Sequence, residues 1–158
     1  MSFFDFKSYN IGAIGQIPKI VTYYGAVHAP RSFSKEEAKH NFKDYYQVGF
    51  PTGINVWKSE YFVFSLEVVP FIRREKGQTK MSNLLFHPGL LIDLGKHFIF
   101  AGRLAFETSG RFGLTPVFSK SFKINEELRF FIATPLPVGF GNERPVTFFP
   151  GLLLGIAI

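Results

Sequence analysis

The histidines, serines and carboxylates of this chain are the residues that could carry chemistry, because the sequence contains no cysteine. Without cysteine there is no disulfide framework, no thiolate nucleophile and no cysteine-based zinc site. The histidines lack the paired spacing of an HExxH helix and so do not indicate a metal site; they are His28, His40, His87 and His97. The stretch Gly12-Ala13-Ile14-Gly15 lacks the spacing of a phosphate-binding loop. We expect neither a metal nor a cofactor.

A histidine beside a serine or a carboxylate could acylate or deacylate lipid near the outer rim of a small barrel. The candidate residues for such chemistry are His28, Ser82, Glu107 and Ser109. Nothing in their spacing singles them out. A lipid-modifying enzyme is therefore an alternative, and the main prediction is a protein without catalytic residues.

Length and composition limit the possible classes of fold. The chain has 158 residues, of which 46% are hydrophobic, 19% are charged and 21 residues are phenylalanine. This length fits one domain, and the composition excludes a disordered or coiled-coil chain. The net charge of +6 could attract nucleic acid or anionic lipid. Because the basic residues fall in predicted loops or on an inner face, we expect no nucleic-acid partner.

Alternation of apolar and polar residues predicts an all-β chain with eight strands. The expected strands are 19–28, 46–57, 59–72, 83–94, 97–107, 113–122, 127–138 and 146–158. Tight connections at 57–59, 94–96 and 123–126 alternate with longer polar ones at 29–45, 73–82, 108–112 and 139–145. This order is typical of an antiparallel up-and-down barrel. Because proline lacks an amide donor, Pro51, Pro88, Pro116 and Pro150 are expected at bulges or breaks in the ladder.

The two faces of these strands differ in charge. Lys120 is the only charge on one face of the seven later strands, and that face carries most of the rings, among them Phe62, Phe64, Phe98, Phe100, Phe106 and Phe130. A narrow eight-stranded interior can hardly hold so many rings, so we expect them to point outward into lipid. The alternative is a soluble lipocalin-like barrel that binds a small apolar ligand. The late uncharged run 145–158 is too short for a membrane-spanning helix.

The opposite face is predicted to line the lumen. It carries small residues and six charges, which are Glu67, Asp93, Arg103, Glu107, Glu127 and Arg129. Unpaired ions in a narrow lumen would cost several kcal/mol each, so we expect these charges to form a cross-barrel network. Such a network would fill and rigidify the lumen; a role in gating a conduit or protons is the alternative.

Strand number, alternation, the order of turns and loops, and a strand reaching the last residue together resemble a small bacterial outer-membrane barrel. The resemblance is to the eight-stranded OmpA transmembrane domain and OmpX, and it covers 19–158. It implies periplasmic tight turns, external long loops and a Gram-negative outer membrane. Residues 18–158 would form the barrel, and 1–17 a periplasmic segment or an extension of the first strand. Asp5 and Lys7 interrupt any apolar export signal, so a removed signal is assumed.

The long loops carry most of the positive charge. Their basic residues include Lys35, Lys39, Arg73, Arg74, Lys76 and Lys80. In the topology that the resemblance implies, these cations would lie near the phosphates of lipopolysaccharide; ordinary solvation of loops is the alternative. The expected partners are outer-membrane lipid, lipopolysaccharide and other outer-membrane proteins. The expected role is structural, surface-binding or accessory in a membrane complex.

Overall fold

The computed structural model describes residues 19–43, 45–59, 62–141 and 143–158, and this part of the chain is built of β-strands. The strands are β1 (Ile20–His28), β2 (Arg31–Ser34), β3 (Ala38–His40), β4 (Tyr46–Gly49), β5 (Thr52–Trp57), β6 (Phe62–Glu75), β7 (Gln78–Gly95), β8 (Phe98–Glu107), β9 (Phe112–Lys123), β10 (Arg129–Pro135), β11 (Val138–Phe140), β12 (Thr147–Phe148) and β13 (Leu152–Ala157). None of the described segments is a helix long and apolar enough to span a membrane. The prediction for residues 1–17 lies outside the described residues.

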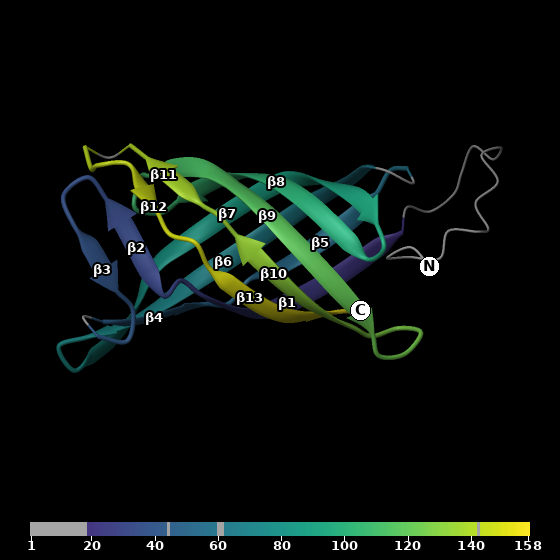
Figure 1. Ribbon diagram of the computed structural model, residues 1–158, viewed down its shortest axis with the longest axis horizontal. Helices are drawn as coiled ribbons and strands as arrows, with labels where there is room; N and C mark the ends of the chain where they lie inside the picture. The colour runs from purple at the N-terminus through teal and green to yellow at the C-terminus, as the bar shows by residue number, and fades with distance from the viewer. Residues whose placement is uncertain (1–18, 44, 60–61, 142) are drawn as a thin grey trace.

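Antiparallel pairing closes these strands into a barrel (Figure 1). β1 pairs with β13 on one side and with β4 and β5 on the other, which joins the first strand to the last. Three barrel strands are interrupted: β4 continues into β5, β10 into β11, and β12 into β13. With the separate β2–β3 hairpin, these interruptions account for the number of elements. The predicted all-β fold with eight antiparallel barrel strands is confirmed.

Four prolines lie at interruptions or gaps of the ladder. Pro51 separates β4 from β5, and Pro150 separates β12 from β13. The β7–β8 ladder has no pair at Pro88, and at Pro116 the neighbour of β9 changes from β11 to β10. Each proline thus lies where the ladder is open, because its nitrogen has no hydrogen to donate.

Two predicted long loops are instead largely strand. Residues 73–82 continue β6 and β7 beyond the barrel, and the chain reverses at Lys76 and Gly77, whose φ angles are 49° and 79°. Positive φ at both turn residues matches the right-handed twist of a hairpin. Residues 29–45 contain the β2–β3 hairpin, in which β2 pairs with β12. The polar composition of these two segments indicated loops. A hairpin that extends beyond the barrel has solvent on both faces, so its strands can be polar as well.

The barrel has two distinct ends. β1 begins and β13 ends at the end that carries the tight turns, and the β2–β3 and β6–β7 hairpins lie at the opposite end, which we call the loop end (Figure 1). An apolar cluster fills the interior at the tight-turn end, including Tyr23, Trp57, Val63 and Phe131. Alanines complete it where the bore is narrow, as in other small barrels. The interior toward the loop end is the part that remains open.

Candidate functional site

A cavity of about 330 Å³ occupies the loop-end half of the barrel interior. Its wall combines apolar side chains such as Val69 and Leu85 with a large number of polar ones. The charged residues of the wall are Glu67, Arg73, Arg103, Glu107, Arg111 and Arg144. The cavity is therefore a cup whose wall combines apolar and charged side chains, and the apolar cluster of the tight-turn half lies beneath it.

Glu67 is the centre of the floor of this cup. Its side chain is only 3% exposed. Oε2 accepts hydrogen bonds from Arg103 Nη1 and from the Tyr23 hydroxyl, each at 2.9 Å, while Oε1 lies 2.9 Å from His87 Nδ1. These partners offset the cost of removing the carboxylate from water.

Arg103 and His87 extend the network across the bore. Arg103 Nη2 donates to the Tyr23 hydroxyl at 2.9 Å and to Ser65 Oγ at 3.2 Å. The second ring nitrogen of His87 lies 2.8 Å from the Thr115 hydroxyl. Side-chain hydrogen bonds of this network connect β1, β6, β7, β8 and β9 across the interior, in addition to the backbone pairing of neighbouring strands. We define the network as Tyr23, Ser65, Glu67, His87, Arg103 and Thr115.

Two glycines make room for the long side chains of this network. Gly89 faces Arg103 in the β7–β8 ladder, and a Cβ there would lie 2.5 Å from Arg103 Cγ. Gly53 faces Tyr23, and its Cβ would lie 2.5 Å from the Tyr23 ring. Cross-strand neighbours point to the same side of a sheet, so a missing side chain on one strand leaves space for a long one on the next.

The six predicted lumen charges are not brought together as one network. Glu67 and Arg103 form a 2.9 Å ion pair, whereas the Glu107 carboxylate lies higher in the cup and accepts from Asn83 and Ser109. Arg129 begins β10 at the tight-turn end, far along the barrel from Glu107 at the loop end of β8. The predicted Glu67–Arg103–Glu107–Arg129 network is therefore wrong in extent.

The other two predicted lumen charges lie at turns. Asp93 accepts a hydrogen bond from the Gly95 amide at 2.7 Å, and Glu127 is exposed in the β9–β10 connection. Alternation along a strand predicts the face of a residue but not its depth along the barrel axis.

The sequence analysis did not predict Tyr23, His87, Ser65 and Thr115 as members of the network around Glu67 and Arg103. Their signal was present, because each is a polar residue or tyrosine on the same face as Glu67 or Arg103.

The candidate residues for lipid chemistry are divided between two surfaces. The His28 side chain lies on the outer face of the barrel, because it follows the outward residues of β1 at every second position. Its Nε2 lies 3.0 Å from the Tyr46 hydroxyl. Ser82, Glu107 and Ser109 line the cavity. The barrel wall thus stands between the histidine and the other candidates. Within the described segments, no group of three or more histidine, aspartate and glutamate side chains could hold a metal ion.

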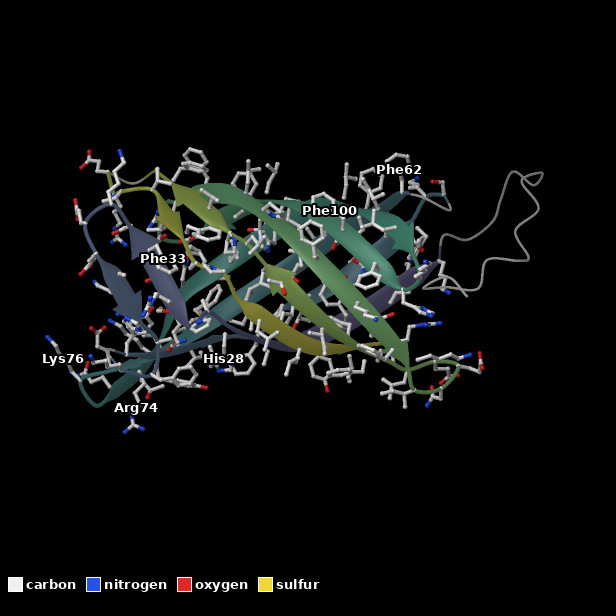
Figure 2. The ribbon with its side chains drawn as sticks, viewed as in Figure 1. His28, Phe33, Phe62, Arg74, Lys76 and Phe100 are labelled. Atoms are coloured by element: carbon white, nitrogen blue, oxygen red, sulfur yellow. The ribbon has the colours of Figure 1, made fainter. Side chains whose placement is uncertain are left out.

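The predicted phenylalanine face lies on the outside of the barrel. Phe62, Phe64, Phe98 and Phe106 each expose about half of their surface. Phe100 exposes less, and its ring lies 5.1 Å from that of Phe118. Phe130 is likewise half-buried, with its ring 6.3 Å from that of Phe122. Figure 2 shows Phe62 and Phe100 on the outer surface.

Among the described residues, one charged side chain lies on the outer face within the apolar belt. Lys120 lies on β9 with Nζ 4.9 Å from the centre of the Phe98 ring, near the tight-turn end. A lysine in this position can extend along the rings toward the polar boundary of the belt.

The predicted loop cations occupy the loop end but in different ways. Arg74 and Lys76 project from the β6–β7 hairpin (Figure 2), and Lys80 is exposed on β7. Lys35 lies in the exposed β2–β3 connection. Arg73 differs, because it lines the cavity, pairs with Glu75 at 3.0 Å and stacks over the Tyr45 ring at 4.0 Å.

Lys39 has an acidic partner on the same hairpin. Its Nζ lies 2.6 Å from Glu37, and this hydrogen bond together with the charge of Glu37 raises the pKa of the Lys39 ammonium. Lys39 therefore stays positively charged, but part of its charge is already balanced.

Comparison with solved structures supports the description of the fold. The barrel is similar to the de novo designed transmembrane barrel TMB2.3, determined by solution NMR, with a TM-score of 0.53 and 10% identity over 89% of this chain and 93% of that chain. The fold is that of a small closed β-barrel. A second structure, titled de novo design of transmembrane beta-barrels, gives a TM-score of 0.49 and 11% identity over 91% of this chain and 98% of that chain. No protein-family model and no curated protein matches the sequence.

Proposed function

We propose that this protein is a membrane-embedded β-barrel of a Gram-negative outer membrane, without catalytic activity. The observation that carries the proposal is the outer apolar belt. Large apolar side chains are exposed on every barrel strand, from Ile20 on β1 to Leu154 on β13. Soluble monomers rarely expose contiguous apolar surface on this scale, whereas a transmembrane barrel requires it.

The arrangement of turns supports an orientation. The tight turns and the end of β13 lie at one end and the hairpins with their cations at the other (Figure 1). In a barrel resembling OmpA or OmpX, the tight-turn end would face the periplasm and the loop end the exterior. The polar β6–β7 extension would then stand outside the membrane, where Arg74 and Lys76 reach solvent or lipid phosphates.

The interior supports a structural or accessory role over that of an open pore. The apolar cluster around Trp57, Val63 and Phe131 fills the tight-turn half of the bore, and the Glu67–Arg103 network lies across it. Eight strands leave a bore that side chains can fill. A soluble barrel with an apolar ligand is supported less well, because the cavity that would hold the ligand is lined by four arginines.

Gel mobility of unheated and heated samples tests the proposal directly. We expect the detergent-extracted protein to migrate differently before and after boiling and to give a β-type far-ultraviolet circular dichroism spectrum, because a closed barrel resists the detergent until it is heated. A protein that stays soluble and monomeric without detergent and shows no shift would contradict the membrane assignment. Lipid turnover by the purified barrel, abolished by Ser82→Ala, would contradict the non-enzymatic part.

The loop-end cations are proposed to bind lipopolysaccharide phosphates. Combining Arg74→Gln, Lys76→Gln and Lys80→Gln should weaken the binding of fluorescent lipopolysaccharide to the barrel in micelles, since each cation near an anionic lipid surface contributes about 1 kcal/mol. Binding to the unchanged protein should weaken as salt is added.

A matched variant controls for net charge. Lys58, Lys96 and Lys123 are exposed at the tight-turn end, so changing all three to glutamine removes the same charge from the opposite end. Equal losses in the two triple variants would show nonspecific attraction and contradict a loop-end site.

A further inference from the structure

The cavity wall carries more positive than negative side chains, namely four arginines and two glutamates. Arg103 is paired with Glu67, and Arg73 with Glu75 on the same strand. Two other arginines of the wall, Arg111 and Arg144, have no ion pair with a carboxylate among the residues that the structure describes. Glu107 alone offers an opposing charge. The cup therefore carries an excess of positive charge.

Glu107 does not neutralise Arg111 directly, although the two residues are neighbours. The Glu107 amide donates to the Arg111 carbonyl at 2.9 Å, which places them opposite each other at the top of β8 and β9. The Glu107 carboxylate instead accepts from Asn83 at 2.7 Å and from Ser109 at 2.8 Å. Its hydrogen bonds are thus directed toward β7 and the β8–β9 turn.

The guanidinium of Arg111 is fixed by neutral acceptors. Its Nη2 donates to the Gly139 carbonyl at 3.0 Å, the Pro145 carbonyl at 3.2 Å and the Thr147 hydroxyl at 2.9 Å. These contacts hold the group in place without cancelling its charge. A cation held in this way loses little conformational entropy when it binds an anion.

Two arginines of the wall keep a buried donor. The Nε atoms of Arg103 and Arg111 are both buried and have no hydrogen-bond acceptor among the described residues. The Arg103 side chain is itself only 7% exposed. Buried donors are normally satisfied, and a charged donor gains most from an ionised acceptor. The protein's own groups therefore leave two arginine N–H donors of this wall unused, in addition to the charge of Arg111 that no carboxylate pairs.

We infer that the loop-end cavity is a binding site for a small soluble anion, a carboxylate or phosphate compound, held by Arg111 above the Glu67 floor. A volume of about 330 Å³ suits a small molecule. The site is enclosed by strands and lies inside the barrel, apart from the exposed cations that we propose for lipopolysaccharide. The inference goes beyond the proposed function and holds whether or not the outer belt contacts lipid.

The test is an NMR titration of the full chain, labelled with ¹⁵N and folded in zwitterionic detergent micelles. Inorganic phosphate and acetate are the probes, and sodium chloride at matched ionic strength is the reference. We expect the Nε–H resonance of Arg111 to shift saturably with either probe. The Nε–H of Arg74, which is exposed outside the cavity, is an internal control and should not shift saturably.

A matched pair of variants tests the assigned residue. Arg111→Gln should weaken phosphate binding about tenfold, because a hydrogen bond to a charged group contributes on this scale. Arg74→Gln removes the same charge from outside the cavity and should change binding by less than about twofold. Both variants must retain the heat-dependent mobility of the folded barrel. If Arg111→Gln does not fold, Arg144→Gln replaces it, with a loss of at least about threefold expected.

Three results would overturn the inference. The first is an equal response of Arg111 and Arg74, or an equal response to sodium chloride, which would indicate screening alone. The second is equal phosphate binding by the cavity variant and by Arg74→Gln. The third is a response to short-chain phosphatidic acid but to neither soluble probe, which would assign the site to a lipid headgroup. None of these results bears on the gel-mobility test of the membrane barrel.

Discussion

Leu66→Arg should destabilise the folded barrel in lipid vesicles by about 2–4 kcal/mol or prevent its insertion. Leu66 is a central outward residue of β6, and its neighbours in the adjoining strands are Ile54 and Pro88. An arginine here would place a charge in the middle of the apolar belt, where neither water nor a carboxylate is within reach. Urea titration of the vesicle-bound protein, followed by gel mobility without heating, measures the change in the free energy of unfolding.

Phe122→Arg is the matched control for depth. Phe122 also faces outward, but it lies near the tight-turn end of β9, and its ring is 5.7 Å from the charged group of Lys120. A second cation at this level can reach the polar boundary, so we expect a cost of about 0–1 kcal/mol. Equal costs at the two positions would contradict an outward lipid face. A water-soluble, monomeric Leu66→Arg barrel would show that inside and outside are reversed.

Arg103→Met should destabilise the barrel by about 3–5 kcal/mol, because it leaves a buried carboxylate without its cation. Glu67 would keep only Tyr23 and His87, and the hydrogen bonds from Arg103 to Tyr23 and Ser65 would be lost. Methionine keeps much of the arginine's volume, so the loss reports on charge and hydrogen bonding more than on a cavity. Urea unfolding in micelles, monitored by Trp57 fluorescence and by gel mobility, gives the difference.

Two further variants separate the ion pair from general effects. Arg103→Met combined with Glu67→Gln removes both charges and should recover much of the lost stability, since the unpaired ion is what costs most. Arg74→Met removes an exposed arginine and should be nearly neutral. A neutral Arg103→Met, or a double variant less stable than Arg103→Met, would contradict a stabilising role for the network.

The interior chemistry could be predicted only in part from the sequence. Glu67 and Arg103 were both expected to point inward, and the structure brings them together. Glu107 and Arg129 were expected to join them, but they lie toward opposite ends of the barrel. His87 was considered only as one of four scattered histidines. Its two contacts, Glu67 and Thr115, lie on β6 and β9, which flank the β7–β8 pair.

The extended hairpins show the same limit. Residues 73–82 read as a polar loop because they lack an apolar face, but β6 and β7 stay paired through Arg73 and Lys80 up to the turn at Lys76 and Gly77. Pairing of polar strands depends on the partner strand and on turn geometry, neither of which appears in the alternation of a single segment.

By itself the sequence determined the eight barrel strands and the faces of their central residues. These are local properties, because successive side chains of a strand point to opposite sides and the prolines and turn residues limit where a strand can run. Only the tertiary structure decided the depth of each inward residue. Depth depends on the stagger between strands, which closure between β1 and β13 sets for the whole barrel. The Glu67–Arg103 floor, the space left by Gly53 and Gly89, and the cup above them all follow from that stagger.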